Sequence, residues 1–579
     1  MRGWLVVVFA LGCRGGAQPT AVTPPPVVRP VARPVAAPVV GCDPKAPAAA
    51  CAAFRAQARS GTLAPCAATS AGRIGEWRYA LVAPLYEPID NISASQLATR
   101  PLSASAETQA VLGAALGTTR VATGRPVVTA ATWAVVPADE LGPQWKVVTV
   151  DGHHPLDDGG GPLTIGLCAA ASGAHVANLD RDAVTTVAMT GVTAMARYTA
   201  ALMDRKGTTY PARDVLPWFE HTDYVHVSNE VSFVPACEPK PDRTQLQPFC
   251  SRESYIELLE AIHANIVELD GSHLGDFGWK WFRHTIEMYE QRHWQFFGGG
   301  RDQTEATRPL LVEHAGTRLA FLGCNMPHST AHTIRNGPNV GYCDLSRLDW
   351  EVRDLRRRGY TPIVSIQHEE VYTHAPPDVI VRDFRRLAAD GAAVVFGSQA
   401  HWAHPFEVVD GAYVHYGAGN FFFDQSWKGA QDATADRLYF HRGKLLSIGH
   451  LFTRLEEGGR PRPMTDRERA GFLRELGDEL AKLPKADPWR APRDIPEPAA
   501  IPDSFLVGTE AIQLVVAVPH DASAKHPLVI DLHHHARADD AVEVSLRRAP
   551  KVHGAVLTTA ITDFMAAHYP IDRDHVTVR

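Results

Sequence analysis

The chain has 579 residues, which is enough for roughly two to four domains of ordinary size. Hydrophobic residues make up 45% of it and charged residues 21%, as in most globular proteins, and the formal net charge is −7 at pH 7. The basic residues are scattered, apart from one local run at 353–358. This balance argues against a nucleic-acid-binding protein, so no nucleic-acid partner is expected.

The first thirteen residues have the layout of an export signal. One basic residue, Arg2, precedes an apolar stretch at 4–11, which is too short to span a bilayer. Cys13 directly follows Ala-Leu-Gly, and this order resembles a bacterial lipobox. We therefore predict a lipoprotein-type signal peptide at 1–13, a lipid on Cys13, and an exported protein of the bacterial cell envelope held on a membrane. A simple secretory signal and a misassigned start are the alternatives.

Export would allow disulfides to form. Cys237 and Cys250 bracket a Pro-containing loop, and Cys324 and Cys343 bracket another, so we predict a disulfide across each loop. Free thiols and metal ligation are the alternatives. No C-x-x-C pair is present, so a structural zinc site is not expected. The pairing of the remaining cysteines stays open: Cys42, Cys51, Cys66 and Cys168.

The composition changes several times along the chain. Residues 14–72 are rich in Pro and Ala and are predicted to form a tether. Residues 73–173 contain two strand patterns, "WRYALVAPLY" and "WKVVTVDGHHPLD", and are predicted to form a small accessory α/β domain. A polar and Pro-rich linker is predicted at 471–502. A small carboxy-terminal module of unknown role follows at 503–579.

Residues 183–470 are predicted to form the central domain. Buried strand patterns such as "AVTTVAMTG" and "TPIVSIQHEE" alternate with helix patterns such as "SRLDWEVRDLRRRG". This alternation indicates an α/β fold with a mainly parallel sheet that is covered on both faces. Sites in such folds collect just beyond the carboxyl ends of the strands.

Four predicted strand ends in this domain carry side chains suited to metal binding or acid–base chemistry. Imidazole, carboxylate and amide oxygen are ligands for zinc, manganese or iron, and such a metal activates water and polarises acyl or phosphoryl oxygens. The alternative is a set of structural histidines and ordinary polar turns. The residues are Asn229 and Glu230; His273 and Asp276; Gln367, His368 and Glu369; and Gln399, His401 and His404.

The same blocks resemble the CapA family of capsule and poly-γ-glutamate synthesis proteins. "DYVHVSNEVSF", "GSHLGDFGWKWFRHTIEMYE", "TPIVSIQHEEVY" and "GAAVVFGSQAHWAHPFEVVDGAYVHYGAGNFFFD" follow the order and spacing of the family's motifs, within 185–470. The resemblance implies the four-layer α/β sandwich of the calcineurin-like metallophosphatases. It also implies that Asn229, His273, Gln399 and His401 would hold metal, and that Glu230, His273 and Asp276 would serve catalysis.

Several positions depart from the family pattern. Val192 stands where the first strand usually ends in Asp, and Gly271-Ser272 replaces Asn-Asn. Gln367 and Gln399 stand at two His positions. These changes remove a carboxylate and two imidazoles, so they favour one weakly held metal or none. Asp531-Leu532-His533 after a carboxy-terminal strand is an alternative source of ligands.

The resemblance leads to two main functional hypotheses. The first is an exported, membrane-anchored protein of capsule or poly-γ-glutamate synthesis, working as a metal-assisted hydrolase or transferase on a cell-surface polymer. The second is a non-catalytic polymer-binding or scaffold protein that keeps the fold with an eroded metal site. A secreted phosphodiesterase would follow from fold analogy alone.

Overall fold

The structure is a computed structural model, and it describes most of the chain between residues 40 and 485. The segments left out of that range are 68–69, 71, 117–120, 124–125, 158–160, 171–172, 242–247, 327–338 and 426–428. Beyond it the described residues are 504–507, 510–517, 526–531, 542–546, 561–562 and 571–578. The predicted signal and Cys13 lie outside the described residues. Within them, no helix combines the length and apolarity that crossing a bilayer requires.

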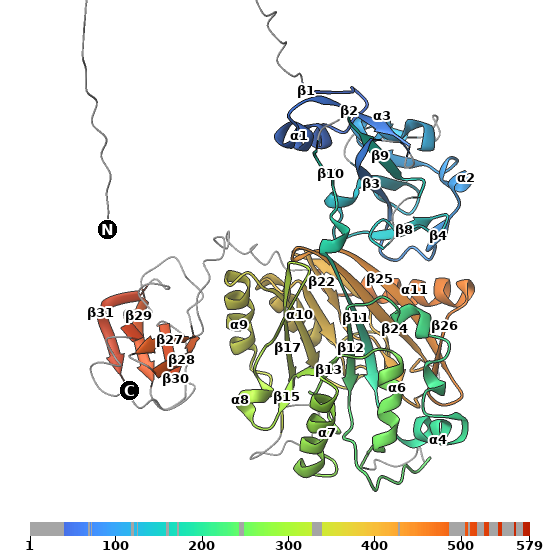
Figure 1. Cartoon of the computed structure of the whole chain (residues 1–579). Helices are drawn as coiled ribbons and strands as arrows, with labels where there is room; N and C mark the ends of the chain where they lie inside the picture. The colour runs from blue at the N-terminus through green and yellow to red at the C-terminus, as the bar shows by residue number, and fades with distance from the viewer. Residues whose placement is uncertain are drawn as a thin grey trace, which may run out of the picture.

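The amino-terminal part forms a ten-stranded mixed sheet (Figure 1). Its longest strand is β3, which pairs with β7, β8 and β9 and is buried from residue 77 onward. The strands are β1 (Val40–Cys42), β2 (Gly61–Cys66), β3 (Arg73–Ala83), β4 (Asn91–Ile92), β5 (Leu102–Ala104), β6 (Val121–Thr123), β7 (Trp133–Pro137), β8 (Lys146–Val150), β9 (Thr164–Cys168) and β10 (Val176–Ala177), with helices α1 (Ala48–Gln57), α2 (Ala94–Leu97) and α3 (Ala106–Leu116).

The predicted tether is too long at its carboxyl end, because residues 40–66 belong to this sheet. Strand β2 pairs with β9, and disulfides join Cys42 to Cys51 and Cys66 to Cys168. The side chains of Phe54 and Leu63 are fully buried. Ala-rich sequence therefore folds here because two apolar side chains and two covalent cross-links stabilise it against the sheet.

The central part has two mixed sheets: the first is parallel from β14 to β11 and antiparallel from β11 to β26, and the second is parallel in its middle with an antiparallel strand at each edge. The first has the order β14-β13-β12-β11-β24-β25-β26 with β23 beside β11, and the second has the order β16-β17-β19-β20-β22-β21. The strands are β11 (Val184–Thr193), β12 (Tyr224–Asn229), β13 (Ile266–Glu268), β14 (Gln295–Phe297), β16 (Leu310–His314), β17 (Thr317–Asn325), β19 (Thr361–Gln367), β20 (Val394–Gly397), β21 (Phe406–Val409), β22 (Ala412–His415), β23 (Asn420–Phe422), β24 (Asp432–His441), β25 (Lys444–Glu456) and β26 (Arg460–Pro463); β15 (Gly299–Gly300) pairs separately with β18 (Asn339–Val340).

Apolar side chains from both sheets meet in one buried cluster. Met189 and Phe297 come from the first sheet, and Phe321, Ile363 and Phe396 come from the second. The outer face of the first sheet is covered by α4 (Arg197–Lys206), α6 (Ile256–Ala261) and α7 (Trp279–Gln291). The outer face of the second is covered by α9 (Leu345–Arg357) and α10 (Asp378–Ala389), on the opposite side of the molecule (Figure 1). Two short helices, α5 (Leu216–Phe219) and α8 (Gln303–Ala306), lie in connecting segments. The prediction of an α/β chain with several sheets is confirmed, while the number of layers stays a prediction.

The predicted linker also begins too early. Helix α11 (Asp466–Leu480) starts in a capping box between Thr465 and Glu468 and buries Phe472, Leu473 and Leu476 in the core between the sheets. Sequence up to residue 480 is therefore part of the central fold. The amino-terminal sheet packs beside it: the ring of Tyr86 stacks on Phe406, and its hydroxyl donates to the Phe406 carbonyl at 2.7 Å.

The carboxy-terminal module contains a five-stranded sheet in the order β27-β28-β30-β29-β31. Asp531 is the last residue of β29, and His533 lies outside the described residues, so the alternative ligand pair is not tested. The strands are β27 (Ser504–Val507), β28 (Glu510–Ala517), β29 (His526–Asp531), β30 (Val542–Leu546) and β31 (Ile571–Val578).

Candidate functional site

The carboxyl ends of the central strands meet at one edge of the fold. Thr193 of β11 pairs with Asn229 of β12. Just beyond β12, Val231 forms an isolated β-bridge with His273. In the second sheet Asn325 pairs with Gln367. Because parallel strands end at a common edge, the loops that follow β12, β13 and β19 lie at this edge of the fold.

Seven buried polar atoms at this edge have no hydrogen-bond partner among the described residues. Such atoms are rare in folded proteins, and a group of them indicates a place for water or a ligand. Each of the residues concerned is at least nine-tenths buried. They are Thr193 (Oγ1), Asn229 (Oδ1), Glu230 (Oε2), Asp270 (both carboxyl oxygens), Gln367 (Nε2) and Gln399 (Oε1).

His273 lies at this edge with its imidazole already oriented. Its Nδ1 is 2.8 Å from Oδ2 of Asp276, and that carboxylate also accepts the backbone N–H of Phe249 at 2.7 Å. Burial alone would lower the pKa of His273, but the hydrogen bond with Asp276 and the nearby Glu230 carboxylate raise it above its ordinary value. The pair therefore favours a protonated imidazole next to Glu230.

His401 is the second imidazole of the site, and it is held at both nitrogens. Nδ1 lies 2.7 Å from Oδ1 of Asn420, and Nε2 lies 3.3 Å from Oε1 of Glu370. Burial would lower the pKa of His401, but Glu370 and Glu230 raise it. In return, His401 lowers the pKa of Glu370 to about 2. We refer to these residues as the strand-end cluster: Asn229, Glu230, His273, Asp276, Glu370, Gln399, His401 and Asn420.

The coupling of His401 to Glu370 can be measured directly. In the Glu370→Gln variant the pKa of His401 is expected to fall, because the neutral amide no longer stabilises the imidazolium. NMR titration of the His401 ring in both proteins tests this. Glu475→Gln is the matched control, since Glu475 lies 3.8 Å from a different imidazole, that of His374. An unchanged His401 pKa in Glu370→Gln would contradict the assigned pair.

An apolar cluster occupies the position where the family pattern has its first Asp. Val192 is fully buried and packs with Val231, Phe249 and Phe423. The Phe249 ring lies 4.3 Å from the His273 ring, and the Phe423 ring lies 5.4 Å from the His401 ring. Both imidazoles are thus contacted by hydrocarbon on the side where the resemblance implies a carboxylate.

A buried arginine lies against the same two phenylalanines. The Arg197 guanidinium is 4.7 Å from the Phe249 ring centre and 4.8 Å from that of Phe423, and it is paired with the buried Asp424. Arg197 has a φ of 47°, in the left-handed region that side-chain-bearing residues rarely adopt. The fold therefore holds a fixed cation next to the cluster at a cost in backbone strain.

The residues present do not fit the two-metal centre that the resemblance implies. Among the described residues, no three His, Cys, Asp or Glu side chains come together as a possible ligand group. His401 has both ring nitrogens engaged by protein groups, and Nδ1 of His273 is engaged by Asp276. Val192, Gln367 and Gln399 supply no charge and no imidazole. Zinc, manganese or iron binding by Asn229, His273, Gln399 and His401 stays an untested prediction.

A second polar network lies beneath the cluster, between the two sheets. Glu268 is fully buried and contacts His226 at 2.9 Å, while Ser365 (2.6 Å) and Ser398 donate to it from the opposite sheet. Burial would raise the pKa of Glu268, but the hydrogen bonds that its carboxylate accepts lower that pKa below its ordinary value. Burial and the Glu268 carboxylate raise the pKa of Asp270 well above its ordinary value. Burial and the neighbouring carboxylate thus both favour the protonated form of Asp270.

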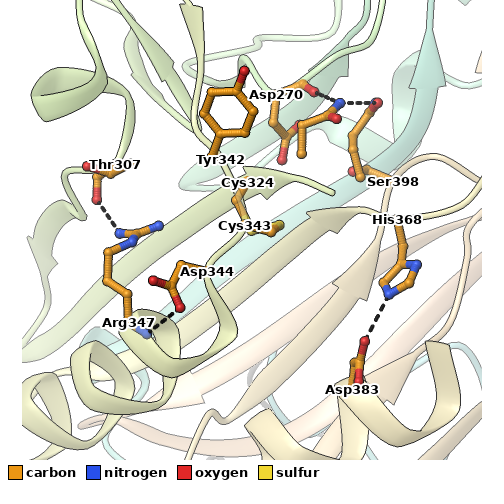
Figure 2. Close-up of a disulfide and its surroundings, with 12 residues drawn as sticks. Asp270, Thr307, Cys324, Tyr342, Cys343, Asp344, Arg347, His368, Asp383 and Ser398 are labelled. Carbon is orange, nitrogen blue, oxygen red and sulfur yellow. Dashed lines mark hydrogen bonds and ion pairs between the residues drawn. A yellow bond between two sulfur atoms is a disulfide. The ribbon is translucent and has the colours of Figure 1, made fainter. Parts of the chain in front are cut away.

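Figure 2 shows how a disulfide lies beside this network. Cys324, in the last part of β17, lies close to Asp270 and Ser398. It forms a disulfide with Cys343, which lies just before α9. The adjacent Asn325 donates to the Asp270 carbonyl at 2.7 Å. The predicted disulfide Cys324–Cys343 is confirmed, and so is the predicted disulfide Cys237–Cys250.

Two predicted residues, His368 and His404, lie away from the cluster. His368 turns toward α10, where its Nε2 lies 3.1 Å from Asp383 (Figure 2), and its Nδ1 accepts the backbone N–H of Glu369. His404 is fully buried between the carbonyls of Tyr416 and Thr373, and burial lowers its pKa to about 4. The structure therefore gives His368 and His404 structural partners.

Other residues of the site were not predicted. Glu370 is adjacent to the predicted Glu369, but only the loop backbone decides which of the two faces His401. Asn420 lies in "GAGNFFF", where the family's Asn-Phe motif could have identified it. Glu268 and Arg197 had no sequence signal, because both act through partners that are distant in the chain.

Comparison with known proteins gives a consistent family. The family model described as "Bacterial capsule synthesis protein PGA_cap" matches residues 186–425. The capsule biosynthesis protein CapA of Bacillus anthracis is 21% identical over 310 residues, which are 51% of this chain and 74% of that protein. The PGA biosynthesis protein CapA of Bacillus subtilis is 23% identical over 256 residues, covering 44% and 67%.

Two further matches are weaker. A probable polyglutamine synthesis accessory protein of Mycobacterium tuberculosis is 26% identical over 209 residues, covering 33% of this chain and 54% of that protein. Among solved structures, NAD nucleotidase of Haemophilus influenzae matches 52% of this chain and 56% of that one with 11% identity. Its TM-score of 0.28 is too low to support any argument about fold. Residues 186–425 thus carry the domain of the CapA family of bacterial capsule synthesis proteins.

Proposed function

We propose that this protein takes part in the synthesis of a capsular polymer of the poly-γ-glutamate kind, and that the strand-end cluster binds the polymer or its precursor. The observation that carries the proposal is the set of unpartnered buried polar atoms within the family-matched region. Amide and carboxyl groups such as those of Asn229, Glu230 and Gln399 are suited to hydrogen bonding with a polymer of amide and carboxylate groups. The imidazoles of His273 and His401, paired with Asp276 and Glu370, offset part of the negative charge of the cluster.

The proposed location is the bacterial cell envelope, with export directed by residues 1–13 and a lipid on Cys13. The Pro-rich stretch that follows supports this, since it would hold the folded part away from a membrane. Four disulfides are compatible with an oxidising compartment.

A hydrolase or transferase acting on the polymer is the second candidate. It is favoured by Glu230, whose Oε2 has no partner and whose charge is felt by both His273 and His401. A carboxylate in this position could take a proton from water while an imidazolium supplies one. No step through a metal is derived, because the donor set does not fit one.

One assay separates these candidates. The purified full chain is expected to bind fluorescently labelled poly-γ-glutamate, to keep that binding after treatment with EDTA, and to contain less than one equivalent of metal. Absence of binding would overturn the proposal. Stoichiometric zinc or manganese that is lost in His273→Ala would overturn the metal-free site. Shortening of the polymer on a gel, abolished in Glu230→Gln, would establish the second candidate instead.

A further inference from the structure

Exposed aromatic rings occur in or next to two loops of the strand-end cluster. Six large hydrophobic side chains are exposed in the described part of the chain, and three of them are aromatic. Phe277 (41% exposed) and Trp279 (49% exposed) directly follow Asp276, and Tyr372 (46% exposed) stacks on His401. Exposed rings of this size cost solvation free energy, so their grouping at one site indicates a contact surface.

The aromatic rings are not needed by the helix that carries two of them. Helix α7 already buries a complete apolar face, which includes Phe282, Ile286 and Tyr289. The next ring, Trp281, packs against the Cys237–Cys250 disulfide and is therefore held in place. Trp279 projects from this firmly packed helix into solvent, so it contributes little to the packing of the core. Its ring therefore offers a rigid surface to a partner.

Two cations lie on the same turn of α7 without an acidic partner among the described residues. Nζ of Lys280 is 4.5 Å from the centre of the Trp281 ring, and the Arg283 guanidinium is 5.1 Å from that of Trp279. The first turn of α7 contains no acidic residue. Nearby acids are either engaged, as Glu253 is with His284, or one turn further along, as Glu287 is. Lys280 and Arg283 therefore place two positive charges beside the aromatic rings at the start of α7.

We propose that the face formed by Phe277, Trp279, Lys280, Arg283 and Tyr372 is the docking surface for the acidic polymer, which it delivers to the strand-end cluster. The inference rests on the proposed function and names the surface that function would use. A γ-linked glutamate chain has a free carboxylate on every residue, which complements Lys280 and Arg283. Its methylene and amide segments suit the flat rings of Trp279 and Tyr372.

The test compares two charge reversals of equal size in the full chain. Lys280→Glu/Arg283→Glu is expected to weaken binding of labelled poly-γ-glutamate at least tenfold at low salt. Arg467→Glu/Arg474→Glu, on exposed arginines of α11 that have no acidic partner within the described part of the chain, is expected to change it less than twofold. Trp279→Ala is expected to weaken binding while leaving its salt dependence intact, because it removes contact area and no charge. Circular dichroism verifies that each variant folds.

The outcomes distinguish this inference from the proposed function. Equal losses in the two charge-reversal variants would mean a general effect of net charge and would overturn the docking surface. Unchanged binding in Lys280→Glu/Arg283→Glu would overturn it too, while leaving polymer binding by the protein in place. If the unmodified chain does not bind the polymer at all, the proposed function fails and the docking surface fails with it.

Discussion

Replacing His226 with alanine is expected to lower the free energy of unfolding of the central sheets by roughly 3–5 kcal/mol, as removing the hydrogen-bonded partner of a buried carboxylate typically does. His226 and Glu268 are both fully buried, 2.9 Å apart, and Phe297 and Phe396 surround the imidazole. Without the imidazole, the hydroxyls of Ser365 and Ser398 and the Asp270 carboxyl group would be left, among the described residues, to stabilise the Glu268 carboxylate. A charge with so few partners in an apolar core is costly.

Hydrogen exchange in a urea series, read on peptides from β12 and β19, measures this loss. The matched control is His314→Ala, whose partner Asp223 lies 3.6 Å away at the surface. That variant is expected to lose only about 0–1 kcal/mol, because water screens an exposed pair. If the free energy of unfolding fell equally little in His226→Ala and His314→Ala, the contact between His226 and Glu268 could not be stabilising a buried carboxylate.

Removing the Cys66–Cys168 disulfide by the double variant Cys66→Ser/Cys168→Ser is expected to destabilise the amino-terminal sheet by about 4–5 kcal/mol. The two cysteines are 102 residues apart, and closing so long a loop restricts the unfolded chain strongly. The disulfide also links β2 to β9, which ties the first part of the folded chain to the sheet. Loss of amide protection in β2 and β9, with β19 unchanged, is the expected signature.

The Cys42–Cys51 pair provides the comparison, because its sequence separation is only 9. Cys42→Ser/Cys51→Ser is expected to cost about 3 kcal/mol or less on the same entropic argument. An equal or larger loss in this short-loop variant would show that packing of the sulfur atoms, and not the length of the closed loop, controls the stability of this sheet.

Two disulfides could be predicted from the sequence and two could not, and there is a physical reason for the difference. Cys237–Cys250 and Cys324–Cys343 each close one local loop, so the spacing alone suggested them. The partner of Cys66 is set by the pairing of β2 with β9, which no local pattern contains. For the same reason residues 40–66 were assigned to a tether, although the sheet and two cross-links hold them.

The candidate site divides in a similar way. Asn229, Glu230, His273 and His401 could be found from the sequence, because each follows a strand that its apolar run makes visible. The sequence could not predict which way the side chains of Glu369 and Glu370 point, because the loop backbone decides which carboxylate contacts His401. His368 and His404 resembled ligands because they also follow visible strands. In the structure His368 pairs with Asp383 of α10, and His404 contacts backbone carbonyls.

By itself, the sequence determined the alternation of strands and helices, the loops at the strand ends, and the replacement of charged family positions by Val192, Gln367 and Gln399. These are local properties that a period of two or of 3.6 residues and a short motif can express. Only the tertiary structure decided that Phe249 and Phe423 contact the two imidazoles, that Glu268 draws donors from both sheets, and that Trp279 faces solvent. Those facts depend on how distant segments pack, and packing between sheets leaves no periodic trace in the chain.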